Sequence, residues 1–141
     1  MTKVLIITGA SRGIGAATAL LAASQGYAVA VNYAANSLAA DEVVRQIRSG
    51  GGTAITVQAD VAVQADVLAM FKKVDVKLGR LTALVNNAGV VDHASRVDAM
   101  SIERLQRMFA INVFGSQGRL DVLGLFFISC MSRDALKSGQ L

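Results

Sequence analysis

The 141-residue sequence contains no proline, no tryptophan, one cysteine and one histidine. With Cys130 alone no intrachain disulfide can form, and a buried thiol without a chemical role is expected there. His93 has no companions at metal-ligand spacing, so no metal site is predicted and His93 is expected in a loop. The most apolar late run, LGLFFISCM, is about half of the ~20 residues that a membrane-spanning helix needs.

Clustered positive charge is also missing. The net charge is +4, but the lysines and arginines are scattered and no aromatic residues are interleaved with them. A nucleic-acid-binding surface needs such clustering, so the charge favours small anionic molecules at most. Glycines and Arg12 end the apolar run after Lys3 too early for this run to be a secretory signal peptide. Neither a nucleic acid nor a membrane is expected as a partner, and a cytoplasmic location is expected.

Strand-like and helix-like segments alternate along the chain. Apolar residues make up 53% of the sequence, enough for one domain with a substantial core. Strands are predicted at 3–8, 27–32, 53–59 and 81–86, and helices at 14–25, 37–49, 63–78 and from 102. This alternation predicts a Rossmann-type, doubly wound parallel sheet in a three-layer α/β/α fold, with strands in the order 3-2-1-4. A ligand crevice is expected at the carboxyl ends of the strands.

The stretch TGASRGIG joins the first predicted strand to the first predicted helix. Gly9, Gly13 and Gly15 would let the backbone turn sharply and approach a ligand closely. Unpaired N–H groups at a helix N-terminus carry partial positive charge and can bind a pyrophosphate. The spacing differs from the familiar Gly-x-Gly-x-x-Gly, and a purely structural turn is the alternative.

Three further motifs follow in order: ADV at 59–61, NNAG at 86–89 and INVFG at 111–115. Each falls at the end of a predicted strand or on the following helix. Together with TGASRGIG they resemble the classical short-chain dehydrogenase/reductase family over residues 3–115. The resemblance implies an oxidoreductase that transfers a hydride between a nicotinamide dinucleotide and an unknown small carbonyl or secondary alcohol.

The same resemblance implies a set of cofactor contacts. The phosphates and the adenosine ribose would be lined by Gly9, Ser11, Arg12 and Ile14, with Gly13 and Gly15 permitting the turn. Asp60 would bind the adenine amino group and residues 87–89 the nicotinamide-side ribose, while Asn86 would tie neighbouring strands together. A helix N-cap is the alternative for Asp60, and a plain turn for NNAG. The implied cofactor-binding residues are Gly9, Ser11, Arg12, Gly13, Ile14, Gly15, Asn32, Asp60, Val61, Asn87, Ala88 and Gly89.

The choice between the two nicotinamide cofactors is predicted from charge. An NAD site usually has an acidic residue after the second strand to bind the ribose 2′-hydroxyl. Here the second strand runs into NYAANS, and no carboxylate occurs before Asp41. Arg12 could instead pair with a 2′-phosphate, although a solvated loop charge is the alternative. NADP(H) is therefore expected in preference to NAD(H).

The family's catalytic pair is absent from this sequence. The family uses a tyrosine as proton donor, with a lysine four residues later and a serine upstream. Tyr27 is followed at that spacing by Val31, and Tyr33 by Ser37, so there is no Tyr-x-x-x-Lys. Asn112, on the apolar face of its predicted helix, matches the family's relay asparagine, which bends the helix and holds a water. A satisfied core asparagine is the alternative.

Residues 116–141 depart from the family pattern. LFFIS, at 125–129, is a candidate for one further strand, and Ser129 for the family's serine, although it follows Asn112 too soon. We expect a truncated or frame-altered relative, with a dinucleotide-binding domain at 1–115 and an atypical segment at 116–141. A shifted frame, an internal deletion and a damaged gene copy are the alternative origins of this segment. The sheet would then be incomplete at one edge, which favours homo-oligomers. A non-catalytic nucleotide-binding or interaction module, or a non-functional fragment, is the alternative to an enzyme.

Overall fold

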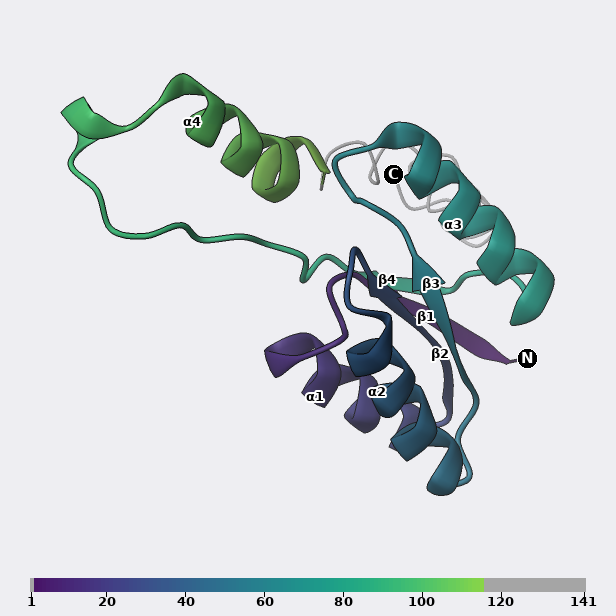
Figure 1. Cartoon of the computed structure of the whole chain (residues 1–141). Coiled ribbons are helices and arrows are strands. Elements are labelled where there is room, and N and C mark those ends of the chain that lie inside the picture. Colours follow the sequence, from purple (N-terminus) through teal and green to yellow (C-terminus); the bar gives the residue numbers. More distant parts are fainter. Residues whose placement is uncertain (1, 116–141) are drawn as a thin grey trace, which may run out of the picture.

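The computed structural model describes residues 2–115, and Figure 1 shows a parallel sheet between helices. The strands are β1 (Lys3–Ile7), β2 (Tyr27–Tyr33), β3 (Ala54–Gln58) and β4 (Ala83–Val85). All neighbouring strands are parallel, in the order β3-β2-β1-β4. The parallel sheet and its strand order confirm the sequence prediction.

Helices cover both faces of this sheet (Figure 1). One face carries α1 (Gly13–Ser24) and α2 (Ser37–Ser49), and the other carries α3 (Gln64–Lys77). Side chains alternate along each strand, so Ile6 and Ala30 pack in the core beneath α3, whereas Ile7 and Val31 pack beneath α1 and α2. Burial on both faces explains why the strands are continuous apolar runs without polar alternation.

The predicted boundary of α3 is wrong at its start. Val63, the first residue of the helix predicted at 63–78, lies before α3 and is 44% exposed. Its N–H donates to the carbonyl of Asp60 at 3.0 Å, which closes a turn before the helix begins. The apolar side chains of α3 itself pack toward the sheet: Val67, Met70, Phe71 and Val74 are buried, and Leu78, just after the helix, is partly buried.

After β4 an extended segment leads to the short 3₁₀ helix η1 (Val97–Ala99), then to α4 (Ile102–Phe109) and the π-helical turn η2 (Ala110–Phe114). Ser101 caps α4 as predicted, since its side chain accepts from the N–H of Arg104. The apolar face of the helix predicted from 102 is largely exposed, since Ile102 is 63% exposed and Phe109 51%. η2 continues α4 without a break, and Figure 1 shows this helical segment lying away from the sheet.

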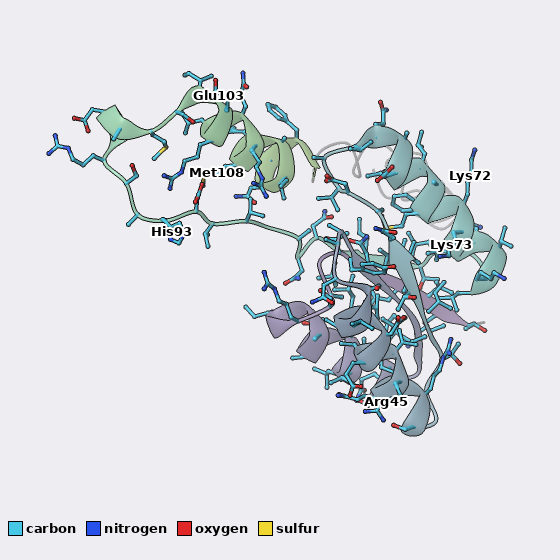
Figure 2. All side chains as sticks on the ribbon, in the orientation of Figure 1. Arg45, Lys72, Lys73, His93, Glu103 and Met108 are labelled. Carbon is cyan, nitrogen blue, oxygen red and sulfur yellow. The ribbon has the colours of Figure 1, made fainter. Side chains whose placement is uncertain are left out.

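The atypical segment at 116–141, with LFFIS, Ser129 and Cys130, lies outside the described residues. Among residues 2–115, no helix has the length and apolar character needed to cross a bilayer. The same residues hold no group of three or more potential metal ligands. His93 lies in the extended segment after β4, as predicted (Figure 2).

Candidate functional site

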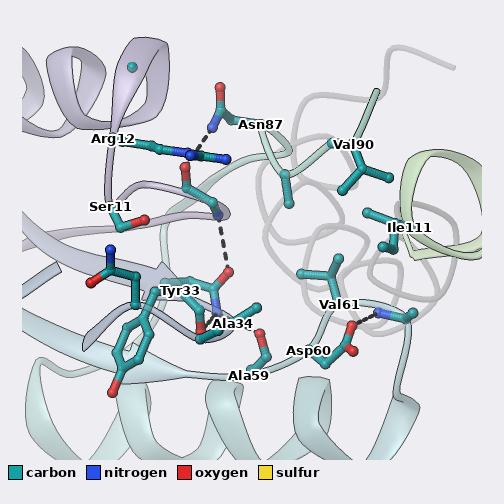
Figure 3. A pocket seen from close by; sticks show the side chains of 18 of the residues that line it. Ser11, Arg12, Tyr33, Ala34, Ala59, Asp60, Val61, Asn87, Val90 and Ile111 are labelled. Carbon is teal, nitrogen blue, oxygen red and sulfur yellow. Dashed lines mark hydrogen bonds between the residues drawn. The ribbon is translucent and has the colours of Figure 1, made fainter. Parts of the chain in front are cut away.

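A cavity of about 690 Å³ opens at the carboxyl edge of the sheet, and Figure 3 shows it from close by. Loops that follow β1, β2, β3 and β4 contribute to its wall, together with part of α4 and η2. Every predicted cofactor contact except Gly15 lines it: Gly9, Ser11, Arg12, Gly13, Ile14, Asn32, Asp60, Val61, Asn87, Ala88 and Gly89. The predicted crevice and the structural cavity therefore coincide.

Several lining residues were missed by the sequence analysis. Tyr33 is the last residue of β2 and residues 34–36 follow it directly, a position that the strand prediction could have identified. Arg107, Ala110 and Ile111 reach the cavity from α4 and η2. Ile111 opens the INVFG motif, but nothing in the sequence marks Arg107 or Ala110 as lining residues, because their position depends on the course of the long segment between β4 and α4.

The N-terminus of α1 is open to the cavity. Arg12 occupies the N-cap position with extended backbone, its side chain makes no capping hydrogen bond, and the first turn contains no acidic residue. The N–H groups of that turn can therefore donate to an external acceptor. The partial positive charge at the helix N-terminus favours an anion as that acceptor. Ile14, in the same turn, lines the cavity and is 81% exposed, so it offers an apolar contact beside the anion-binding end.

Two glycines of this loop are required by close approach. Gly9 has a φ of 62°, and a Cβ atom there would lie 2.9 Å from the Cα of Ala88. Gly15 is helical, but a Cβ atom there would lie 2.7 Å from the carbonyl oxygen of Gly9 and would overlap the side-chain amide of Asn87. The glycines thus allow the loop before α1 and the loop after β4 to pack together.

Hydrogen bonds join the same two loops. Thr8, which is fully buried, accepts at Oγ1 from the backbone N–H groups of Asn87 and Ala88, each at 3.0 Å. The Asn87 side-chain amide donates to the carbonyls of Thr8 at 2.9 Å and Gly9 at 3.0 Å. The tie between strands that was expected from Asn86 is therefore made by Asn87, its neighbour.

Asp60 forms a turn at the start of the loop after β3. Its Oδ1 accepts from the N–H of Ala62 at 2.9 Å (Figure 3). Its own N–H donates to Oδ2 of Asp66 at 2.9 Å. The N-cap of α3 is Val63, so the N-cap alternative for Asp60 is wrong. The carboxylate is held at the cavity wall by this turn.

Asn112 lies in the π-helical turn, outside the cavity lining. Its Oδ1 accepts from the N–H of Val90 at 2.8 Å, and its Nδ2 donates to the carbonyl of Val90 at 2.9 Å. The residue is exposed, so the predicted place on a buried face and the core-asparagine alternative are both wrong. Its amide instead fixes the peptide groups of Val90, next to the cavity.

A second contact attaches the extended segment between β4 and η1 to α4. Nε of Arg104 lies 3.1 Å from Oδ2 of Asp92, and its Nη2 donates to the carbonyl of His93. Arg104 and Asn112 therefore attach the segment after β4 to the α4–η2 helix at two places, Asn112 at Val90 and Arg104 at residues 92–93. The course of the segment beside α4 is visible in Figure 2.

The carboxylates with lowered pKa lie elsewhere. Hydrogen bonds from Arg45 and Gln46 lower the pKa of Glu42, on α2, to about 2. A hydrogen bond from Arg96 lowers the pKa of Asp98. Neither carboxylate lines the cavity.

Comparisons with known proteins extend over most of the chain. The pattern of the short chain dehydrogenase family matches residues 3–118. An uncharacterized oxidoreductase of Escherichia coli K12, YgfF, is 42% identical over 139 residues, which cover 96% of this chain and 52% of the relative. A 3-oxoacyl-[acyl-carrier-protein] reductase of Synechocystis is 45% identical over 80% of this chain and 45% of the relative. A solved Serratia marcescens short-chain dehydrogenase/reductase, in two double-mutant forms, has a TM-score of 0.77 at 37% identity, over 82% of this chain and 49% of that chain. The chain thus spans about half the length of the curated relatives it matches.

Proposed function

The chain belongs to the short chain dehydrogenase family, and on this basis we propose that its cavity binds a nicotinamide dinucleotide, NADP(H) in preference to NAD(H). The observation that carries the proposal is the open N-terminus of α1, which no side chain caps and which lines the cavity. A pyrophosphate supplies the anionic acceptor that such a helix end favours. The family's cofactor is thus matched by the chemistry of the residues present.

Each wall of the cavity suits a different part of the cofactor. The loop before α1 would bind the pyrophosphate through backbone N–H groups, with Ile14 against the apolar side of the ligand. Asp60 would accept from the adenine amino group at the other end of the wall. Residues 87–89 would orient the nicotinamide-side ribose, because Thr8 and the carbonyl of Gly9 fix that loop. When bound, the nicotinamide ring supplies or accepts the hydride.

The preference for NADP(H) rests on charge. Arg12 lines the cavity, is exposed, and makes no ion pair with any residue in 2–115. At the end of β2 and just after it, the wall consists of residues 33–36, none of them acidic. An unpaired guanidinium, together with the absence of a carboxylate from residues 33–36, favours a 2′-phosphate over a 2′-hydroxyl.

We propose further that the 141 residues by themselves bind the cofactor without turnover. The sequence has two tyrosines, and neither is followed by a lysine at the family's spacing. A positioned proton donor contributes typically ~10²–10⁴-fold, so hydride transfer to a carbonyl would be slow without it. A non-catalytic binding module is the second candidate, favoured by the same absence. The small carbonyl or alcohol substrate, a homo-oligomeric state and a cytoplasmic location stay predictions.

Calorimetric titration of the purified chain with NADPH and with NADH tests the proposal. We expect saturable binding of NADPH and weaker binding of NADH. The matched variant is Gly9→Val, which puts a branched side chain at a φ of 62° and against Ala88, and should abolish binding of both. Absence of NADPH binding by the folded parent chain would contradict the proposal.

A further inference from the structure

Asn32 is one of two fully buried polar residues within residues 2–115, the other being Thr8. It lies near the end of β2, with 1% of its surface exposed. A buried amide must find partners for its two donors and its acceptor, because each unpaired group costs free energy. Its partners therefore show why an asparagine stands in an otherwise apolar strand.

The Asn32 side chain bonds to two loops at once. Its Oδ1 accepts from the N–H of Gly9 at 3.1 Å. Its Nδ2 donates to the carbonyls of Val57 at 3.2 Å and Ala59 at 3.1 Å. Gly9 belongs to the phosphate loop (residues 8–12), and Ala59 begins the adenine loop (residues 59–62). One side chain thus connects the two loops that flank the cavity on either side of β2.

Backbone bonds would survive the loss of this side chain. The N–H of Ala10 donates to the carbonyl of Asn32 at 2.8 Å, and the N–H of Ala59 donates to the carbonyl of Tyr33 at 3.0 Å. These bonds belong to the strand itself and do not depend on residue 32 being asparagine. The side chain adds the bonds to the N–H of Gly9 and the carbonyl of Ala59, which set how the two loops sit relative to each other.

We propose that Asn32 is a positioning residue that holds the phosphate loop and the adenine loop in one fixed arrangement, rather than a residue that contacts the cofactor. This inference rests on the proposed dinucleotide site. It assigns Asn32 to the adenosine half of the ligand, because Gly9 and Ala59 lie in the loops for that half. The nicotinamide half depends instead on the bonds between Thr8 and Asn87.

The informative variant is Asn32→Asp, which has nearly the same shape. The carboxylate keeps an acceptor for the N–H of Gly9, but it has no donor for the carbonyls of Val57 and Ala59 and faces their oxygens. The matched control is Thr82→Val, at the opposite edge of the sheet. Thr82 Oγ1 accepts from the N–H of Val4 and donates to its carbonyl, both at 2.9 Å, and its loss weakens strand contacts away from the cavity.

The probe is 2′,5′-ADP, which carries the adenosine half of NADP(H) without the nicotinamide. Titration calorimetry should show binding to the parent chain, affinity weaker by about tenfold or more for Asn32→Asp, and parental affinity for Thr82→Val. Urea unfolding should show that both variants lose stability. Parental affinity in Asn32→Asp, or an equal loss in both variants, would overturn the positioning role. Failure of the parent chain to bind would overturn the proposed function itself, and this inference with it.

A measurement on the parent chain covers the case in which Asn32→Asp does not fold. The N–H of Gly9 and the side-chain amide protons of Asn32 belong to one junction, so they should exchange slowly with solvent, and 2′,5′-ADP should slow both further. The N–H of Ala62, bonded to Asp60, should respond to the same ligand. Rapid exchange at Gly9 while the Asn32 amide stays protected would overturn the proposal.

Discussion

Gly15 packs on the carbonyl of Gly9, so closely that a Cβ atom at position 15 would lie 2.7 Å from that oxygen. Real Cβ atoms do not approach other atoms so closely, so any side chain would push the first turn of α1 away from the phosphate loop. The side-chain amide of Asn87 fills the space on the same side. This packing fixes the helix N-terminus at the cavity.

The variant Gly15→Ala should weaken NADPH binding by about tenfold or more. Alanine favours a helix interior over glycine by about 1 kcal/mol, so helix propensity alone predicts no loss. Gly50→Ala is the control, because a Cβ atom there would meet nothing closer than 3.5 Å. Calorimetric titration measures both. Parental affinity in folded Gly15→Ala would show that the packing is not needed.

Replacing Arg12 should remove the preference for NADP(H). In Arg12→Ala the Kd for NADPH should rise by about tenfold to a hundredfold, since hydrogen bonds to charged groups contribute about 1.5–3 kcal/mol. The Kd for NADH should change little. Arg45→Ala, on the outer surface of α2 (Figure 2), controls for the loss of one positive charge. Equal weakening of both cofactors would assign Arg12 to the pyrophosphate instead.

Binding and turnover should separate in this chain. NADPH oxidation, followed by absorbance with a panel of small ketones and aldehydes, should stay at background, because no tyrosine–lysine pair is present in the 141 residues. A full-length member of the family serves as the positive control. Turnover that persists after purification and disappears in Asn112→Ala would mean that this chain uses a different proton donor.

The exposed apolar side chains of α4 and η2 should promote association. Phe109, Val113 and Phe114 are 51%, 43% and 62% exposed, and the two phenylalanine rings lie 6.4 Å apart. Clustered apolar surface of this kind favours protein–protein contact. We expect oligomers by light scattering, with less association in Phe114→Lys. Val76→Lys, at an 82% exposed position on α3, is the control. A monodisperse parent monomer would contradict the expectation.

The sequence predicted most of the fold and much of the site because both depend on local patterns. Continuous apolar strands, helical stripes and a glycine-rich turn specify where each loop at the carboxyl edge lies, and Gly9, Asp60 and Asn87 meet there as expected. The place of α4 could not be predicted, because it depends on a long segment whose course is set by Asn112 and Arg104. The junction at Asn32 was also invisible, since its partners are backbone groups that carry no sequence signal.

The binding of NADP(H) at this cavity is tested most directly by amide chemical shifts during titration of the ¹⁵N-labelled chain with NADPH. Shift changes should concentrate at Gly9, Asp60 and Ala88, which are far apart in sequence but line one cavity. The amide of Thr82, at the opposite edge of the sheet, should not move. No shift changes, or changes confined to α3 and the amino edge of the sheet, would contradict a dinucleotide site between these loops.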